Sequence, residues 1–303
     1  MMEKRYGGIV IYKPEGITSF DVVARLRKLF GTRKVGHTGT LDPMAKGVLV
    51  CLIGRAVKLS DLLTCHDKRY RAGLKLGITT DTEDITGKVL EKNEFLPSEK
   101  EVIDIIPRFR GEIMQIPPMY SALKVDGKKL CDLARNGTVI EREARPITVH
   151  KLDVTPVDPS NGDYILDVHC SKGTYIRTLC NDIGNALGCG GVMSSLERGS
   201  SGKLTLDDAH TLTELENMTV DERYSLLIPA DMLFEDINKV TLPEFFEKLA
   251  RSGNQIYQKK IGVDIPVGEK VAMYGKDGLF AIGEVREYTE GSAIKPLKQL
   301  DID

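Results

Sequence analysis

The sequence contains no tryptophan, no cysteines spaced as CxxC and no apolar run long enough to span a membrane. A spanning helix needs about 20 apolar residues, so none is expected. The N-terminal apolar stretch, GIVIY, is too short for the core of a secretory signal, which favours a cytoplasmic protein. The six cysteines and five histidines are dispersed, so we expect neither a disulfide framework nor a bound metal.

The formal net charge of −2 points to no particular partner. Its distribution is uneven, because residues 1–75 hold 15 basic and 6 acidic residues, whereas residues 203–238 hold two basic and nine acidic ones. A basic N-terminal quarter fits a surface that binds a polyanion. An ordinary solvated charged surface fits the same numbers, so charge alone leaves both interpretations open.

Apolar patterning predicts strands and helices without a repeating βαβ rhythm. Thr18 or Ser19 is placed to cap the first helix, and Gly188 to end a later one. This mixture predicts an α+β fold with a largely antiparallel or mixed sheet. The expected strands are 8–12, 70–76 and 164–170, and the expected helices are 20–30 and 176–187.

A second, smaller unit follows the acidic stretch. Residues 240–253 predict a short helix, with Thr241 as its cap and Pro243 in its first turn. Several short strands follow over 268–298, including a hairpin at Lys276-Asp277-Gly278. We therefore expect a main domain over 1–237 and a compact, mostly β domain over 238–303.

Asp42 lies in GHTGTLDPMAKG (36–47), a stretch marked by glycines and by Pro43. A carboxylate in such a loop beside a basic helix is placed to act on a polyanionic ligand. On spacing alone, an Asx-turn or a helix cap before Pro43 is the simpler role. The stretch is not a phosphate-binding P-loop, since no Gly-Lys-Ser/Thr follows its glycines. The acids of 80–84 lack the spacing of a calcium loop.

Five motifs, in order, resemble those of the TruB family, bacterial enzymes that modify the tRNA T-loop uridine conventionally numbered 55. The resemblance covers nearly the whole chain and implies a pseudouridine-synthase-type mixed sheet with flanking helices and a PUA-like C-terminal domain. The motifs are KPEGITS (13–19), GHTGTLDPMAKGVL (36–49), DKRYRAGLKLGITTDTEDITG (67–87), PPMYSALKVDGKKLCDLARNG (117–137) and CSKGTYIRTLCNDIG (170–184).

The resemblance implies isomerisation of uridine to pseudouridine without a cofactor. The base must leave the stack, the N-glycosidic bond must break, and C5 must become bonded to C1′. Asp42 matches the catalytic aspartate, acting either as a nucleophile at C1′ or as a base at C2′. Tyr70 matches a tyrosine that stacks on the uracil and assists C5 deprotonation, and Arg177 an arginine that pairs with the aspartate and keeps it ionised.

Four further positions match substrate-site residues of the family. Tyr175 matches a pocket-lining tyrosine, and Leu196 an apolar residue beside the base. His37 matches a histidine that fills the space left in the T-loop by the flipped base, and Lys13 belongs to a motif that supports the active-site loop. Without the resemblance, these side chains, like Tyr70 and Arg177, would be read as core, loop or surface ion-pair residues.

Residues 124–151 resemble an RNA-clamping insertion, with a basic excess that predicts phosphate contacts to the T-arm. After Leu196 the chain departs from the family pattern, with Glu197 and Gly199 in place of an arginine and a threonine. The insertion's charged residues are Lys124, Lys128, Lys129, Arg135, Arg142, Arg145 and Lys151, with Asp126, Asp132, Glu141 and Glu143.

Three hypotheses remain at this stage. The first is a stand-alone T-loop synthase that acts on tRNA without guide RNA, obligatory protein partner or membrane. The second is a guide-RNA-dependent relative of the dyskerin type, which the clamp-like insertion and the absence of a basic tail disfavour. The third is a non-catalytic RNA-binding or RNA-folding protein, which the intact Asp42, Tyr70 and Arg177 disfavour.

Overall fold

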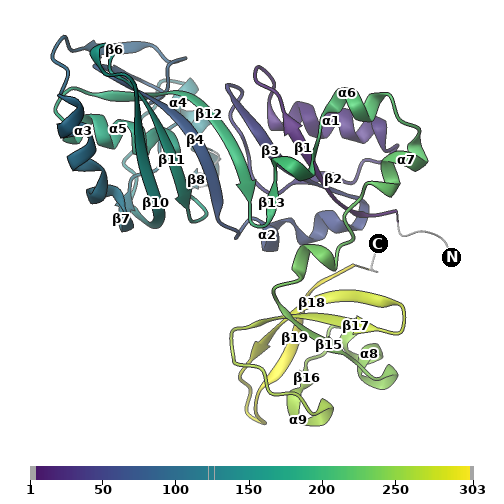
Figure 1. Cartoon of the computed structure of the whole chain (residues 1–303). Helices are drawn as coiled ribbons and strands as arrows, with labels where there is room; N and C mark the ends of the chain where they lie inside the picture. Colours follow the sequence, from purple (N-terminus) through teal and green to yellow (C-terminus); the bar gives the residue numbers. More distant parts are fainter. Residues whose placement is uncertain (1–4, 122, 126, 301–303) are drawn as a thin grey trace.

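The computed structural model describes residues 5–121, 123–125 and 127–300, and it contains two main sheets (Figure 1). The larger has ten strands and carries most of the helices. In spatial order its strands are β14 (Ala209–His210), β1 (Gly7–Lys13), β3 (Ala45–Ile53), β12 (Gly191–Ser201), β4 (Lys68–Leu76), β11 (Asp163–Cys170), β10 (Arg145–Asp158) and β7 (Gly111–Gln115), with β2 (Val35–His37) beside β3 and β13 (Leu204–Thr205) beside β12.

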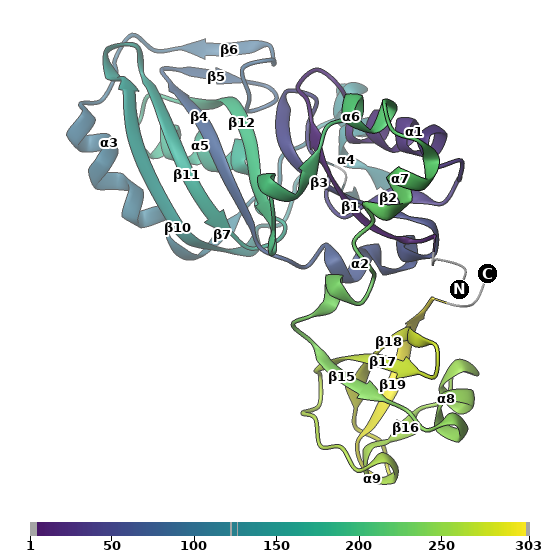
Figure 2. The same cartoon turned by 45° about the vertical axis from the view of Figure 1, so that its right-hand side comes forward.

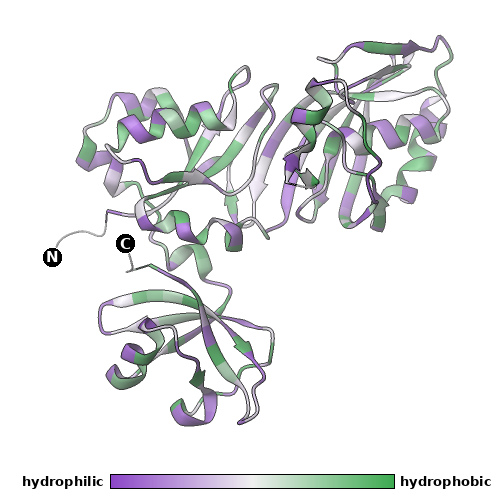
Figure 3. Cartoon of the chain, turned by 180° about the vertical axis from the view of Figure 1, so that it is seen from behind, coloured by the Kyte–Doolittle hydropathy of each residue, from purple (hydrophilic) through white to green (hydrophobic). Residues whose placement is uncertain are grey.

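Two strand pairs in this sheet, β1 with β14 and β3 with β12, are parallel, and the other pairs are antiparallel. The predicted mixed sheet is therefore confirmed. Along β11 every second residue is buried, as expected for a strand with one face on the core. Figure 3 shows hydrophobic and hydrophilic residues alternating along several strands.

Helices pack against the large sheet at both of its ends (Figures 1 and 2). Val22, Val23 and Leu26 of α1 and Ile176, Leu179 and Ile183 of α5 enter the same core as the strands. None of the helices in the described part of the chain is long and apolar enough to cross a membrane. The helices are α1 (Ser19–Leu29), α2 (Ser60–Leu63), α3 (Glu99–Ile105), α5 (Ile176–Ala186), α6 (Leu212–Glu216) and α7 (Val220–Ser225).

The start of α1 is fixed by two hydroxyl groups with different tasks. Thr18 forms a capping box with Asp21, because its hydroxyl accepts from the Asp21 N–H at 3.0 Å and Asp21 Oδ2 accepts from the Thr18 N–H at 2.8 Å. Ser19 Oγ instead bonds the main chain of Leu41, accepting from its N–H at 2.8 Å and donating to its carbonyl at 3.0 Å. Helix α1 is thereby tied to the loop that carries Asp42.

The segment between β7 and β10 contains the predicted insertion. It holds β8 (Lys124–Val125), β9 (Lys128–Lys129) and α4 (Leu130–Arg135). Residues 145–151 of the expected range belong instead to β10 of the main sheet. Asp126, one of the acidic residues counted there, lies outside the described residues. Strands β5 (Ile78–Thr80) and β6 (Val89–Lys92) pair with each other and form a separate hairpin beside the large sheet (Figure 2).

The second sheet has five strands, and the expectation of a small, mostly β unit is confirmed. Its hairpin turns at Lys276-Asp277, because Gly275 pairs with Gly278. The predicted helix exists, but its expected cap is wrong: Thr241 ends a strand, and Pro243 is the N-cap residue without a side-chain bond. The elements are β15 (Asn238–Thr241), α8 (Glu244–Arg251), β16 (Ile256–Tyr257), α9 (Gln258–Ile261), β17 (Lys270–Gly275), β18 (Gly278–Arg286) and β19 (Ala293–Gln299).

The two sheets share an apolar cluster, which we call the joint core. From the large-sheet side it contains Leu52, Ala56, Leu59 and Leu63, and from the connecting segment Ala230, Leu233 and Phe234. From the second sheet it contains Ala272, Leu279, Ile282 and the following Leu300. Leu52, Leu59, Ile282 and Leu300 are fully buried, so the joint core contributes to the stability of both parts.

Candidate active site

Asp42 lies in the loop between β2 and β3, and neighbouring segments hold this loop from two sides. The Gly16 N–H donates to the Pro43 carbonyl at 2.8 Å, and Ser19 bonds Leu41 as described above. The Asp42 side chain is 34% exposed, so it is accessible to a substrate. The Asp42 carboxylate faces Arg177.

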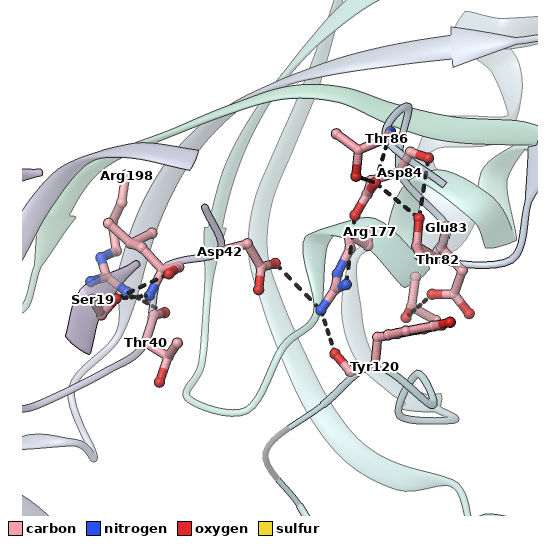
Figure 4. Close-up of polar contacts among 12 residues, drawn as sticks. Ser19, Thr40, Asp42, Thr82, Glu83, Asp84, Thr86, Tyr120, Arg177 and Arg198 are labelled. Atoms are coloured by element: carbon pink, nitrogen blue, oxygen red, sulfur yellow. Dashed lines mark hydrogen bonds and ion pairs between the residues drawn. The ribbon is translucent and has the colours of Figure 1, made fainter. Parts of the chain in front are cut away.

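Arg177, in the first turn of α5, binds three acceptors (Figure 4). Its Nη2 lies 3.3 Å from Asp42 Oδ2 and donates to the Tyr120 carbonyl at 2.9 Å. Its Nη1 lies 3.6 Å from Asp84 Oδ2. The guanidinium is nearly buried, with three oxygen atoms from three different segments around it. The predicted pair of Asp42 and Arg177 is thus present in the structure.

Burial raises the pKa of the Asp42 carboxyl. The Arg177 guanidinium opposes that rise, whereas the second carboxylate, Asp84, adds to it. Burial also raises the pKa of the Tyr70 hydroxyl, so this tyrosine is held in its neutral form at ordinary pH. The site therefore combines two carboxyl groups around one cation with an uncharged aromatic ring.

A cavity of about 300 Å³ opens beside the Asp42 carboxylate. Tyr70 from β4, Tyr175 and Arg177 from the start of α5, and Leu196 from β12 line it together with Asp42. Small-ligand sites are commonly such concave, partly apolar spaces with a few polar groups. Five of the seven residues selected from the sequence are brought together here.

The other two selected residues, Lys13 and His37, are not among the residues that line this cavity. Lys13 is fully buried, and its Nζ donates to the carbonyls of Pro14 at 2.8 Å and Ile17 at 2.6 Å. Burial lowers the pKa of Lys13 to about 8. His37 is half-buried in β2, and burial lowers its pKa. Lys13 Nζ also donates to the Pro43 carbonyl, in the Asp42 loop, at 3.4 Å. His37 lies two residues before the first cavity-lining residue of that loop, Gly39.

Arg198 was recognised in the sequence only as part of an altered motif, yet it holds the Asp42 loop. It is 2% exposed, and its guanidinium donates to the carbonyls of Gly39 at 3.0 Å, Thr40 at 3.3 Å and Val48 at 2.7 Å. A hydrogen bond from a charged donor to a carbonyl is stronger than one from a neutral donor. The available signal was an arginine two positions after Leu196, on the same face of the strand, but the sequence does not show which carbonyls it contacts.

Asp84 also escaped the sequence argument, which had only excluded a calcium loop at 80–84. Its Oδ1 accepts from the hydroxyl of Thr82 at 2.9 Å and from the N–H of Thr86 at 2.9 Å, and its Oδ2 faces Arg177. The preceding Glu83 has a φ of +62°, which is unusual for a residue with a side chain. Glu83 Oε2 accepts from the Thr178 hydroxyl at 2.5 Å, which ties this turn to α5.

The two departures from the motif pattern lie outside the cavity lining. Glu197 Oε1 accepts from the Tyr12 hydroxyl at 3.2 Å. A Cβ at Gly199 would meet only the Arg69 carbonyl, at 3.9 Å, so a larger residue has room there. Neither change alters the groups around Asp42.

Two family models together match residues 27–235 of the chain. Residues 27–176 match the TruB family pseudouridylate synthase N-terminal domain, and residues 177–235 match the tRNA pseudouridylate synthase B C-terminal domain. The chain is 45% identical over 282 residues to tRNA pseudouridine synthase B of Alkaliphilus oremlandii. The match covers 92% of this chain and 93% of that protein. It is 41% identical over 280 residues to the enzyme of the same name from Clostridium tetani, covering 92% and 95%.

Among solved structures, a chain in a Cbf5-Nop10-Gar1 complex superposes with a TM-score of 0.74 at 27% sequence identity. The match covers 98% of this chain and 85% of that one, so both sheets are included. Because the family model spans the loop of Asp42 and the relatives match along nearly the whole length, this chain belongs to the TruB family of pseudouridylate synthases.

Proposed function

We propose that this chain converts the T-loop uridine of tRNA conventionally numbered 55 into pseudouridine. The observation that carries the proposal is the pair of Asp42 and Arg177 at the wall of a cavity lined by two tyrosines and a leucine. The family membership and the names of the bacterial relatives support uridine in tRNA as the substrate.

In the proposed reaction the target uridine leaves its stack and enters the cavity. Leu196 and the ring of Tyr70 pack on the uracil, and Tyr175 borders it. Arg177 keeps the Asp42 carboxylate ionised against the effect of burial, which by itself favours the protonated acid. The walls exclude water while the detached uracil turns, so that C5 rather than N1 meets C1′.

Two chemistries fit the Asp42 carboxylate. As a nucleophile it bonds to C1′ and the N1–C1′ bond breaks; later the C5–C1′ bond forms, Asp42 leaves, and C5 loses its proton. As a base it first takes the proton from C2′ while the N1–C1′ bond breaks, which leaves a C1′–C2′ double bond; C5 then bonds to C1′, the proton returns to C2′, and C5 loses its own proton. A tRNA with deuterium at C2′ of the target uridine separates the two pathways, since only removal of that proton gives a primary isotope effect.

The central test uses unmodified tRNA and purified protein, with pseudouridine mapped at single-nucleotide resolution. We expect modification at the T-loop uridine by the wild-type chain, without added guide RNA, protein or cofactor. We expect none with Asp42→Asn, which keeps the shape of the side chain and removes its charge. Equal modification by the variant refutes the role of Asp42, and a requirement for a guide RNA favours the dyskerin-type hypothesis.

We further propose that residues 1–237 form the catalytic domain and 238–303 an RNA-binding domain, and that the reaction takes place in the cytoplasm on the T-arm of tRNA. The insertion that begins at Lys124 is proposed to contact T-arm phosphates. Such contacts weaken as salt rises, because bound counterions are released on association. An affinity for tRNA that does not change across a salt series rejects the phosphate contacts and leaves the catalytic proposal intact.

A further inference from the structure

Gln115, the last residue of β7, makes a two-point contact with the main chain of Tyr175. Its side-chain Oε1 accepts from the Tyr175 N–H at 2.8 Å, and its Nε2 donates to the Tyr175 carbonyl at 3.1 Å. The residue is 2% exposed. One buried amide therefore satisfies the donor and the acceptor of a single residue in the active-site wall.

Tyr175 directly precedes α5, which begins at Ile176. It is the N-cap position, and its own side chain forms no cap bond, although its carbonyl accepts from the Leu179 N–H at 3.0 Å. Arg177 follows two residues later, within the first turn. Because helical residues move together, the contact that fixes Tyr175 also fixes the direction from which Arg177 reaches Asp42.

A second contact joins the same two segments a few residues further on. The Tyr120 carbonyl accepts from Arg177 Nη2 at 2.9 Å. Between Gln115 and Tyr120 lie two consecutive prolines, Pro117 and Pro118, both buried. Proline fixes φ near −65°, so the segment 115–120 is stiff. It is attached to the first turn of α5 at both of its ends.

We propose that Gln115 is a positioning residue for catalysis, which holds Tyr175 and, through the first turn of α5, Arg177 in the geometry that the reaction needs. The inference rests on the proposed function, which places Tyr175 and Arg177 at the substrate. Gln115 itself lies behind the cavity wall and does not line the cavity. Its loss should therefore slow the chemical step rather than weaken the binding of tRNA.

The test compares Gln115→Met with a matched control in α9 of the C-terminal unit. Gln258 is also buried, at 3% exposure, and makes the same pair of bonds to one residue: Nε2 to the Ile265 carbonyl at 2.9 Å, and the Ile265 N–H to Oε1 at 2.8 Å. Gln258→Met removes this contact, together with a bond from Nε2 to the Ser292 hydroxyl at 2.9 Å, at a residue that does not line the cavity. Methionine keeps the length of the side chain in both variants and removes its hydrogen bonds.

We expect Gln115→Met to reduce the single-turnover rate at saturating tRNA about 10- to 100-fold, as small misplacements of reacting groups do. The Kd for tRNA should stay within about twofold of the wild-type value. Gln258→Met should lower the melting temperature and leave the single-turnover rate at saturating tRNA unchanged, whatever its effect on tRNA binding by residues 238–303. Equal rate losses in the two variants, or a loss confined to the Kd, overturns the proposal.

In Gln115→Glu the rate should depend on pH in a way that a general loss of stability does not produce. When protonated, the carboxylic acid donates to the Tyr175 carbonyl and accepts from its N–H, as the amide does. When ionised, it only accepts, and it faces that carbonyl with a negative charge. The rate of Gln115→Glu relative to wild type should therefore rise as pH falls. A ratio that is independent of pH counts against the proposal.

Hydrogen exchange tests positioning without any assay of activity. The amides at the start of α5, from Ile176 to Leu179, should exchange faster in Gln115→Met and at the wild-type rate in Gln258→Met. Unchanged exchange in Gln115→Met overturns the inference even if the enzyme proves inactive on tRNA. Failure of the proposed function is seen separately, as a wild-type chain that forms no pseudouridine.

Discussion

Asp42 and Asp84 share one cation, because the two terminal nitrogens of Arg177 lie 3.3 Å from an oxygen of the first and 3.6 Å from an oxygen of the second. Asp84 is 4% exposed and is further bonded by Thr82 and Thr86. Its side chain is therefore held in place behind Arg177. The charge on Asp42 depends on both neighbours, and in opposite directions.

Substitutions of these neighbours should move the acid limb of the pH–rate profile in opposite directions. Asp84 raises the pKa of Asp42, so Asp84→Asn should lower it and retain activity to lower pH. Arg177 lowers that pKa, so Arg177→Gln should move the loss of activity to higher pH. Single-turnover rates between pH 4 and 8 measure both shifts. If the acid limb moves in the same direction in both variants, the result contradicts this electrostatic account.

Loss of Arg198 should reduce stability and rate together. Arg198→Met leaves the carbonyls of Gly39, Thr40 and Val48 without this donor, and we expect a loss of about 3 kcal/mol in unfolding free energy. The Asp42 loop loses its anchor, so the rate should fall about 100-fold.

Arg223 offers a matched control. It is also buried, and it donates to the carbonyls of Leu215, Leu29 and Met218, away from the cavity. Arg223→Met should unfold at a similarly reduced denaturant concentration while its rate at saturating tRNA stays near the wild-type value. A comparable rate loss in both arginine variants argues that Arg198 acts through stability alone.

Lys13 should make stability depend on pH in the alkaline range. Its pKa is about 8 in the folded chain, below the ordinary value of 10.5, because it is buried. Between these two values the unfolded chain binds more protons than the folded one, so the free energy of unfolding rises with pH, by up to about 3 kcal/mol. Urea denaturation at pH 7 to 10 should show this rise in wild type relative to Lys13→Met. A constant difference between the two contradicts it.

Gly47, at the end of the Asp42 motif, should not tolerate a side chain. Its φ is +105°, and a Cβ there would lie 2.3 Å from the Arg198 carbonyl oxygen. Gly16→Ala is the control, since Gly16 has a φ of +88° and nothing within 4 Å of its would-be Cβ. The control should lose about 1–2 kcal/mol from backbone strain, and Gly47→Ala clearly more. Similar melting temperatures for the two variants refute the clash.

Local patterns predicted the elements well because they depend on near neighbours. The alternation in β11, the Thr18 cap and the helix through Ile183 can all be read from adjacent residues. The cap at Thr241 failed because pairing with Tyr274 in β17 extends the strand through that residue. Long-range pairing overrides a local capping preference, and one sequence does not reveal it.

Site residues that belong to a motif could be selected from the sequence. Residues that contact the site from a distant segment of the chain could not. Asp42, Tyr70 and Arg177 were found through their motifs. Arg198, Asp84 and Gln115 act through main-chain carbonyls, a shared cation and a backbone amide, none of which has a signature in sequence. In the sequence, a buried arginine cannot be distinguished from an exposed one until the carbonyls that it contacts are known.

The joint core has a consequence for the order in which the protein can be completed during synthesis. Leu52 of β3 and Leu59 after it are buried partly by Ala272, Leu279, Ile282 and Leu300. The ribosome makes these partners only after every residue of the cavity has emerged. Until then, the strand that follows the Asp42 loop keeps an apolar flank open to water, so the nascent chain is exposed to aggregation and chaperones during that interval.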